Sequence, residues 1–370
     1  MVCTGGPQRP ASQAVAMHQR LREAFPAPEP RLLQTRVMNK NMKDVFALGL
    51  ASDWMRASWS PLMKNRSPPR TVFLHNDQGI EKIIKIVERD VLPDITEPIV
   101  LFTLSHDKTI PRQLDKRYPN SSEQLLDRVR SVLDSPLIER WVVENLDTSG
   151  FHDKFMPIPL GFFCHPYYSC GPSWWPVIKA EWIRPLAERP LMMVCNGRLH
   201  QELDKKNASG VIDTHPQFQF RRSVLELCMP RHGPWSAFTD FRAWVPDQNG
   251  TWSARWWQNH SFVLCAHGGG LDPSPRAVQA IAAGAIPIIQ HSPLDAAYSL
   301  LPVVFVDSWT AEALTVEKLR RWKEELLPYY DDPRLRIEVI KRLTMDYWWR
   351  VALDGTRAAT GDHSQLKDWS

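Results

Sequence analysis

A glycine-rich turn followed by an arginine is the part of this 370-residue sequence whose residue types most clearly suggest chemistry. The apolar run Phe262–Cys265 leads into His267 and three consecutive glycines, Gly268, Gly269 and Gly270. Glycines let backbone N–H groups approach a phosphate closely, because no Cβ atom intervenes. The turn therefore predicts an anion site at the carboxyl edge of a sheet, where open α/β sheets bind their ligands.

Arg276 lies in the first turn of the helix that we expect after the glycines. Asp272 or Ser274 can cap that helix, and Pro275 suits its opening position. The helix dipole disfavours a cation there, whereas a bound phosphate would pair bidentately with the guanidinium. Gln279, on the same helical face, could then reach the ribose of a nucleotide. A structural turn with a solvated arginine is the alternative.

Two common nucleotide motifs are absent from this turn. The Gly-x-Gly-x-x-Gly spacing of dinucleotide-binding folds is missing, and no Gly-Lys-Ser/Thr follows as it would in a P-loop. An unrelated Rossmann-type oxidoreductase is therefore disfavoured.

Strand ends in the first half supply groups that could accept a proton. His75–Asp77 and Ser105–Asp107 each follow an apolar run, and Glu144 and Asp147 flank a third run. General base catalysis needs a carboxylate or imidazole facing the substrate. The same residue types also make ordinary turns and caps. The choice of base stays open, with Asp107 and His106 as the first candidates.

Two further arginines of the second half are candidates for phosphate contacts. Arg222 belongs to an arginine pair at the start of an expected helix, and Arg198 follows an expected strand. A solvated basic face is an equally good interpretation of both.

The elements that must position these groups alternate between short apolar runs and amphipathic stretches, which predicts parallel sheets covered by helices on both faces. We predict strands at Thr71–His75, Pro98–Leu104, Arg140–Asn145, Phe155–Leu160, Leu191–Cys195, Phe262–Cys265, Ala285–Ile289 and Val303–Val306. The predicted fold class is α/β, with two Rossmann-like domains facing each other across a cleft. The predicted division is an N-terminal extension (1–65), a first domain (66–165), a connection (166–189), a second domain (190–330), and a C-terminal helix and tail (331–370).

Composition limits the partners that we expect. The net charge of +4 is small and the basic residues are interspersed with acidic ones, which argues against a dedicated nucleic-acid surface. No apolar run is long enough to span a bilayer, and the first residues lack the pattern of a secretory signal.

Cysteines and asparagines give mixed evidence on the compartment. Six cysteines contain no Cys-x-x-Cys pair, and we expect Cys195 and Cys265 to be small buried hydrophobes. Cys164 and Cys170 are interpreted as structural, or as a disulfide. Asn-x-Ser/Thr triplets, which are typical of secreted proteins, begin at Asn65, Asn120, Asn207, Asn249 and Asn259. The Golgi lumen and the cytoplasm both stay open.

The run from Ser261 to Trp309 resembles the nucleotide-sugar-binding region of exostosin-like glycosyltransferases. In that family an apolar strand leads to His-Gly or Arg-Gly, and a short loop ends in an arginine. A helix with an acidic residue follows, and then Gly-x-Ile-Pro-Ile/Val. The matching positions are His267, Gly268, Arg276, Gln279, Gly284, Ile286, Pro287 and Ile288. The segments Trp141–Asp147, His152–Lys154 and Pro157–Gly161 resemble the end of the family's first domain.

This resemblance implies a GT-B fold and an inverting transfer of sugar from a nucleoside diphosphate sugar, with a UDP-sugar as the first choice, to a hydroxyl of a glycan or other acceptor. The donor is a substrate, so no cofactor is expected. No metal is expected either, because no Asp-x-Asp follows an apolar strand. The family commonly has Glu where this chain has Gln279, and an amide offers the ribose one acceptor fewer than a carboxylate. The alternative is therefore a non-catalytic protein that binds a nucleotide sugar or a glycan.

Overall fold

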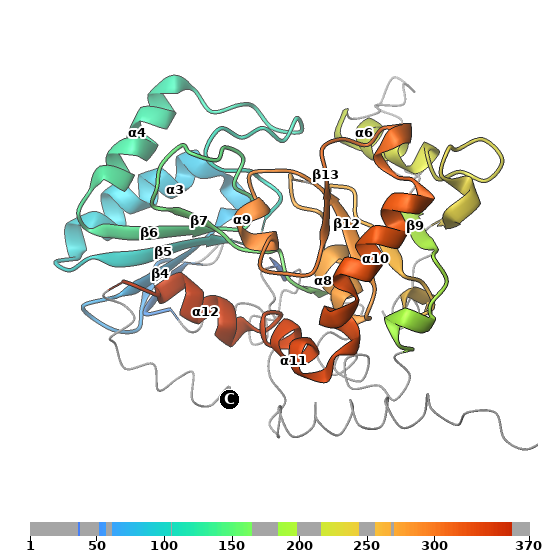
Figure 1. Ribbon diagram of the computed structural model, residues 1–370. Helices are drawn as coiled ribbons and strands as arrows, with labels where there is room; N and C mark the ends of the chain where they lie inside the picture. The colour runs from blue at the N-terminus through green and yellow to red at the C-terminus, as the bar shows by residue number, and fades with distance from the viewer. Residues whose placement is uncertain are drawn as a thin grey trace, which may run out of the picture.

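The computed structural model describes residues 36–37, 52–56, 61–104, 106–164, 184–197, 216–243, 256–267 and 270–356. These residues form two α/β halves that lie side by side, each built on its own sheet (Figure 1). This confirms the predicted fold class.

The sheet of the first half has the order β3-β2-β4-β5-β6-β7. Its strands are β2 (Trp54–Arg56), β3 (Met63–Lys64), β4 (Thr71–His75), β5 (Ile99–Leu104), β6 (Ile138–Val143) and β7 (Phe155–Pro157). All neighbouring pairs are parallel except β2 with β3. Every residue of β5 is buried, as expected of a central strand in a sheet with both faces covered.

Helices cover both faces of this sheet (Figure 1). On one face lie α3 (Ile80–Ile86), which continues into η3 (Val87–Val91) and η4 (Leu92–Asp94), and α4 (Glu123–Asp134). The Ser122 side chain caps α4 by accepting a hydrogen bond from the Leu125 N–H. Leu126, Val129 and Leu133 then recur at helical spacing and are buried, which fixes the face that α4 turns to the sheet.

The sheet of the second half has the order β10-β9-β11-β12-β13, and all its neighbouring pairs are parallel. Its strands are β9 (Met193–Gly197), β10 (Thr239–Ala243), β11 (Phe262–Leu264), β12 (Ile286–Gln290) and β13 (Val304–Val306). After β9, the chain places β10 on one side of it and then β11, β12 and β13 on the other side. The strand order therefore reverses between β9 and β11, the type of position at which such sheets bind ligands.

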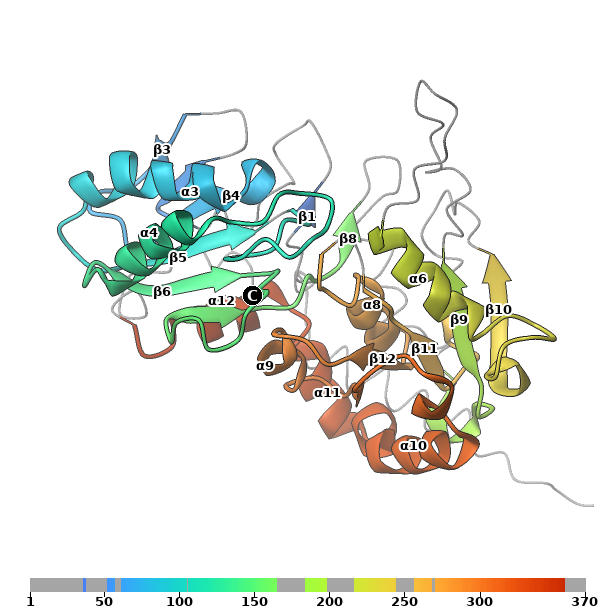
Figure 2. The ribbon, with the colours of Figure 1, turned by 90° about the horizontal axis from the view of Figure 1, so that it is seen from above.

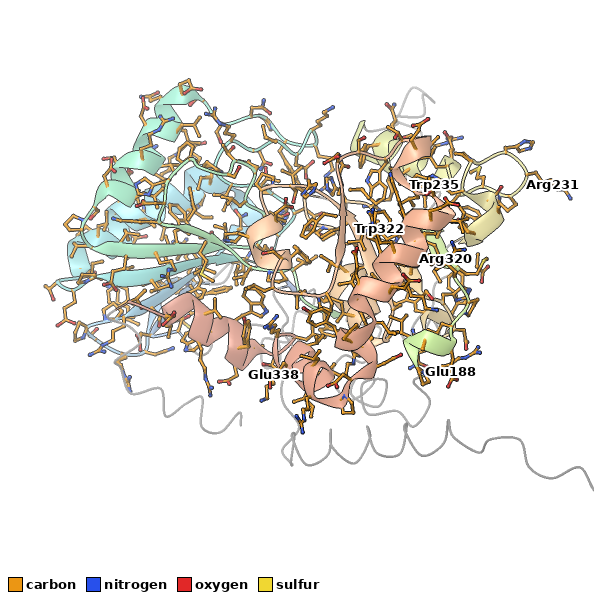
Figure 3. The ribbon with its side chains drawn as sticks, in the orientation of Figure 1. Glu188, Arg231, Trp235, Arg320, Trp322 and Glu338 are labelled. Atoms are coloured by element: carbon orange, nitrogen blue, oxygen red, sulfur yellow. A yellow bond between two sulfur atoms is a disulfide. The ribbon has the colours of Figure 1, made fainter. Side chains whose placement is uncertain are left out.

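Successive residues of β11 enter different cores, as the pleat requires. Phe262 and Leu264 pack in the core that includes α6 (Pro216–Glu226) and α10 (Val316–Asp331), whereas Val263 packs in the core that includes α8 (Arg276–Ala282). On α10, Trp322 packs against the first of these cores and Arg320 is exposed (Figure 3).

Shorter elements complete the described chain: β1 (Arg36–Val37), η2 (Asn76–Gln78), β8 (Phe163–Cys164), η5 (Leu186–Glu188), η6 (Ser236–Phe238), α9 (Asp295–Tyr298), η7 (Ala311–Ala313), α11 (Pro333–Lys341) and α12 (Met345–Leu353).

The end of the described chain returns to the first half. In both views α12 lies against the first sheet (Figures 1 and 2). The Trp349 ring stacks on Phe102 of β5 at 5.3 Å between centroids. The Arg140 guanidinium donates to the carbonyls of Val351 and Ala352, at 3.1 and 2.7 Å. Because of these contacts, α12 holds the two halves together.

Parts of the predicted division differ from the structure. Residues 1–65 were predicted to be an extension outside the first domain, yet they contain β2 and β3, which belong to the first sheet. Strands of three and two residues are too short to produce a recognisable period. Most of the connection 166–189 lies outside the described residues, as do most of residues 1–51 and all residues after 356.

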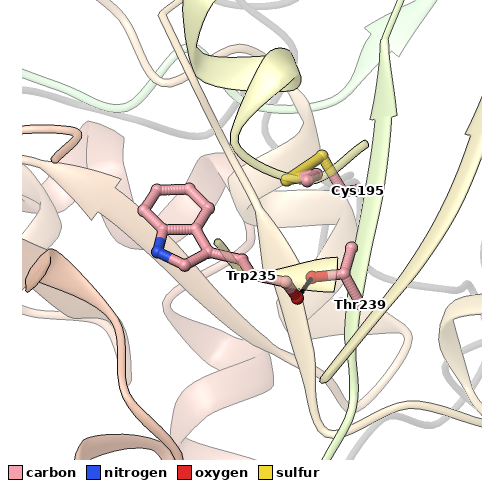
Figure 4. Close-up of a disulfide and its surroundings, with 4 residues drawn as sticks. Cys195, Trp235 and Thr239 are labelled. Atoms are coloured by element: carbon pink, nitrogen blue, oxygen red, sulfur yellow. Dashed lines mark hydrogen bonds between the residues drawn. A yellow bond between two sulfur atoms is a disulfide. The ribbon is translucent and has the colours of Figure 1, made fainter. Parts of the chain in front are cut away.

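A disulfide joins Cys195 of β9 to Cys228, just after α6, next to Trp235 (Figure 4). Cys195 is buried as predicted, but it is half of a disulfide and does not act only as a small hydrophobe. Cys265 is both buried and free, and burial raises the pKa of its thiol to about 12. The prediction for Cys265 is therefore confirmed. The Cys164 side chain and Cys170 lie outside what the structure describes.

Candidate functional site

The loop that follows β11 lies where the strand order of the second sheet reverses, and α6 holds it in place. The Arg221 side chain donates from Nε and Nη2 to the carbonyl of His267, at 3.2 and 3.0 Å. The Phe220 ring stacks on the His267 imidazole at 5.7 Å between centroids. The predicted site residues Gly268 and Gly269 lie outside the described residues.

The surroundings of the His267 imidazole favour its neutral form, which keeps hydrogen-bonding capacity. Burial lowers its pKa, and the Arg221 cation lowers it further, against an opposing effect of Asp272. Its Nε2 atom is buried and has no hydrogen-bond partner within the described part of the chain. A buried ring nitrogen normally has a partner, so it could serve a bound ligand.

Beyond the glycines, the backbone turns sharply. The buried Asp272 carboxylate accepts a 2.8 Å hydrogen bond from the Ser274 N–H. Ser274 has a φ of 66°, a left-handed conformation that costs free energy for a residue with a Cβ atom and often occurs at functional sites. The carboxylate thus stabilises the turn. Neither Asp272 nor Ser274 caps α8 as predicted: Pro275 is the N-cap residue, and the helix has no side-chain cap.

Arg276 is the first residue of α8, as the sequence predicts, and Gln279 follows on the same short helix. Both are partly exposed. By contrast, Arg222 is exposed and pairs with Glu226 at 3.1 Å, so Arg221 is the member of the arginine pair that contacts the loop. Arg198 lies outside the described residues.

Gly270 is where the loop meets the first half of the molecule. A Cβ atom added there would lie 2.5 Å from Asn145 Oδ1 and 2.7 Å from the carbonyl oxygen of Asp107. Asn145 and Asp107 follow β6 and β5. The carboxyl edges of the two sheets therefore face each other and touch, and the contact is close enough to require a glycine.

The predicted bases lie at this junction. The His106 N–H donates to the buried Glu144 carboxylate at 2.6 Å, and the His106 carbonyl accepts from Asn145 at 3.1 Å. His106 Nδ1 accepts the Lys108 N–H at 3.1 Å, so a neutral ring carries its proton on Nε2.

The second predicted base, Asp107, is a quarter exposed and pairs with Arg117 at 2.9 Å. The same guanidinium also holds the buried Asp115 carboxylate, at 2.6 Å. Asp107 is thus an accessible carboxylate with a neighbouring cation. The other early candidate, the segment His75–Asp77, forms a local turn in which His75 Nδ1 accepts the Asp77 N–H.

Within the described ranges, no three His, Cys, Asp or Glu side chains lie together as metal ligands would. Likewise, no helix in those ranges is both long and apolar enough to cross a membrane.

No protein-family model matches the chain, and no curated protein matches it. Among solved structures, it is similar to a glycosyltransferase from Rickettsia africae, at 13% identity over 77% of this chain and 91% of that one, with a TM-score of 0.34. It is similar to a sucrose-phosphate synthase from Thermosynechococcus elongatus, at 12% identity, 81% and 74% coverage and a TM-score of 0.40. Anabaena HepE, solved with UDP and glucose, gives 11% identity, 81% and 78% coverage and a TM-score of 0.36. Likenesses this distant assign no residue role.

One contact residue at the site, Asn145, was not predicted from the sequence. The pair Arg221 and Arg222 was predicted as a candidate, but the phase of α6 had to be known to tell which of the two contacts the loop. Asn145 adjoins the candidate Glu144, and its role depends on the contact with Gly270 between the halves.

Proposed function

We propose that the chain transfers a sugar from a nucleoside diphosphate sugar, with UDP-sugars as the first choice, to a hydroxyl of a glycan or other acceptor. One observation carries the proposal: the loop His267–Arg276, at the strand-order reversal of one sheet, meets the strand-end loops of the other sheet at Gly270. The resemblance of the same loop to exostosin-like enzymes supports the choice of reaction.

The donor diphosphate would contact Arg276 and the loop backbone, with His267 Nε2 supplying a hydrogen bond. Preorganised charge of this kind stabilises the negative charge that develops on a leaving diphosphate. Gln279 would contact the ribose.

In the transfer, the acceptor oxygen forms a bond to the anomeric carbon while the bond from that carbon to the diphosphate oxygen breaks. The diphosphate leaves with the bonding electrons, and the acceptor proton passes to a base. We propose Asp107 as that base, ahead of His106, because a neutral His106 carries its proton on Nε2. Inversion and independence of metal follow from the resemblance and stay predictions.

A donor panel tests the proposal. UDP-, GDP- and CMP-sugars are titrated calorimetrically into the wild type, Arg276→Ala and the control Arg320→Ala, an exposed arginine of α10. We expect a UDP-sugar to bind, with affinity reduced about ten- to a hundredfold by Arg276→Ala, the loss of a charge-assisted contact. Arg320→Ala should bind like the wild type. Equal affinity in Arg276→Ala would refute the diphosphate assignment.

A second candidate function is binding of a nucleotide sugar without transfer. Gln279 in place of the family's Glu, and the pairing of Asp107 with Arg117, favour it. Release of free sugar from the donor separates the two functions. A transferase hydrolyses its donor slowly in the absence of acceptor and loses this activity in Asp107→Asn, whereas a binding protein shows a thermal shift with donor and no sugar release.

A further inference from the structure

A pocket of about 500 Å³ lies in the first half, beside the loop that follows β5. Its wall combines the start of α3, the first turn of α4 and residues between Lys108 and Ser122. Lys108 directly follows Asp107, whose carbonyl adjoins Gly270. The pocket therefore begins one residue from the junction of the two halves.

The charged groups in the pocket wall each have a partner within the protein. Arg128 makes a paired contact with Glu88, and Glu81 accepts a 2.7 Å hydrogen bond from Lys85. The Lys108 ammonium donates to the Asp77 carbonyl at 2.6 Å and lies 4.9 Å from the centroid of the Tyr118 ring. Burial also lowers the pKa of Lys108. Arg128 and Glu81 are thus engaged by opposite charges, and Lys108 is engaged by a carbonyl and an aromatic ring.

The remaining polar lining consists of amides, hydroxyls and one aromatic ring: Gln113, Tyr118, Asn120, Ser121, Ser122 and Gln124. Amides and hydroxyls both donate and accept hydrogen bonds, which matches the alternating needs of sugar hydroxyls. An aromatic ring supplies an apolar surface with a polar edge.

The pocket wall is also preorganised. Gln113 is buried and has a φ of 58°, a strained left-handed conformation in a residue that is not glycine. Its Oε1 accepts the Thr109 N–H at 3.1 Å, and the Thr109 hydroxyl donates to the buried Asp147 carboxylate at 2.6 Å. A wall fixed by buried hydrogen bonds loses little conformational entropy when a ligand binds.

From these observations we infer that the pocket binds a neutral saccharide, with Tyr118, Gln124 and Asn120 as its recognition residues. The inference rests on the proposed function only in taking this saccharide to be the acceptor. Saccharide binding itself needs neither donor nor transfer.

Saturation-transfer NMR without donor tests the inference. The probes are methyl glucoside, methyl galactoside, methyl xyloside, lactose and cellobiose, with glucuronate and glucose 6-phosphate as anionic probes. We expect a neutral probe to bind the wild type, with affinity about tenfold lower in Gln124→Ala and in Tyr118→Ala, or about 1.4 kcal/mol. Tyr329→Ala, an exposed tyrosine of α10, is the matched control and should bind like the wild type.

Gln124 is exposed on the first turn of α4, so its truncation should leave the fold intact even if Tyr118→Ala perturbs packing. Binding of no neutral probe, or equal binding by Gln124→Ala, would overturn the inference. Binding of anionic probes alone would overturn the choice of a neutral ligand. Failure of the donor panel with saccharide binding intact would instead refute the proposed transfer and leave the pocket assignment standing.

Discussion

The loop after β5 and the loop after β11 occupy equivalent positions at the facing edges of the two sheets, but they are stabilised differently. The first is held by buried carboxylates: Asp115 of the same loop pairs with Arg117, and Asp147 of the loop after β6 accepts from the Thr109 hydroxyl and the Arg112 N–H. The second is held by Arg221 of α6, which donates to the His267 carbonyl, and by the contact of the Asp272 carboxylate with the Ser274 N–H. A loop fixed by several buried carboxylates suits a preformed pocket, whereas a loop held mainly through one backbone carbonyl can adjust around a ligand.

The largest expected effect is the difference in stability between variants of two buried carboxylates, Asp147 and Asp272. Asp147→Ala removes the buried acceptor of the buried Thr109 hydroxyl and of the partly exposed Arg112 N–H, so we expect the free energy of unfolding to fall by about 3 kcal/mol. Asp272→Ala should lower the free energy of unfolding by only about 1 kcal/mol. It should, however, reduce donor affinity more than Asp147→Ala does. Urea denaturation and donor titration measure both quantities, with the exposed Asp127→Ala as control. The comparison is contradicted if Asp147→Ala lowers the free energy of unfolding less than Asp272→Ala does.

Contact between the loops is tested at Gly270. A Cβ atom would come within 2.5 Å of Asn145 Oδ1, so we expect Gly270→Ala to cost about 1–3 kcal/mol and to reduce sugar transfer. Gly150→Ala is the control. Gly150 has a φ of 73°, so an alanine there should cost about 1 kcal/mol of stability, but no atom lies within 4 Å of the added Cβ. Gly150→Ala should therefore leave transfer unchanged. Equal transfer by Gly270→Ala and the wild type would show that the junction is not needed.

The pH dependence of stability tests the buried state of His267. Its pKa in the folded chain lies below the ordinary value of 6.5. The unfolded chain therefore binds more protons below pH 6.5, and this residue's contribution to stability is present above that pH and is lost as pH falls. His267→Gln should lose less stability than the wild type between pH 7 and pH 5. Thermal unfolding across that range measures the difference, and identical profiles would contradict the assignment.

The smallest difference concerns the arginine pair on α6. Arg222→Ala breaks an exposed pair with Glu226 and should change stability by about 0.5 kcal/mol or less, with no effect on donor affinity. Arg221→Ala removes the two hydrogen bonds to the His267 carbonyl and should weaken donor binding about tenfold. Calorimetric titration compares the variants. If Arg222→Ala has the larger effect, the sequence-based choice of Arg222 was right and Arg221 is structural.

Features that depend on local sequence could be predicted, whereas features that depend on contacts distant in sequence could not. The alternation of buried strands with amphipathic helices was enough for the α/β fold class, because burial imposes those periods locally. The position of Arg276 at the start of α8 was also predictable, since a glycine-rich turn and Pro275 mark a helix start. The short strands β2 and β3, and the pairing of Cys195 with Cys228, depend on contacts distant in sequence. So does the pocket wall around Gln113 and Tyr118, which carries no local motif.

The central claim, that the loop His267–Arg276 binds the diphosphate of a nucleotide sugar, is tested most directly by photolabelling with 5-azido-UDP-glucose and peptide mapping. We predict that the label falls within residues 261–290 and that excess UDP prevents it. Labelling confined to the first half, or labelling that UDP does not prevent, would contradict the claim.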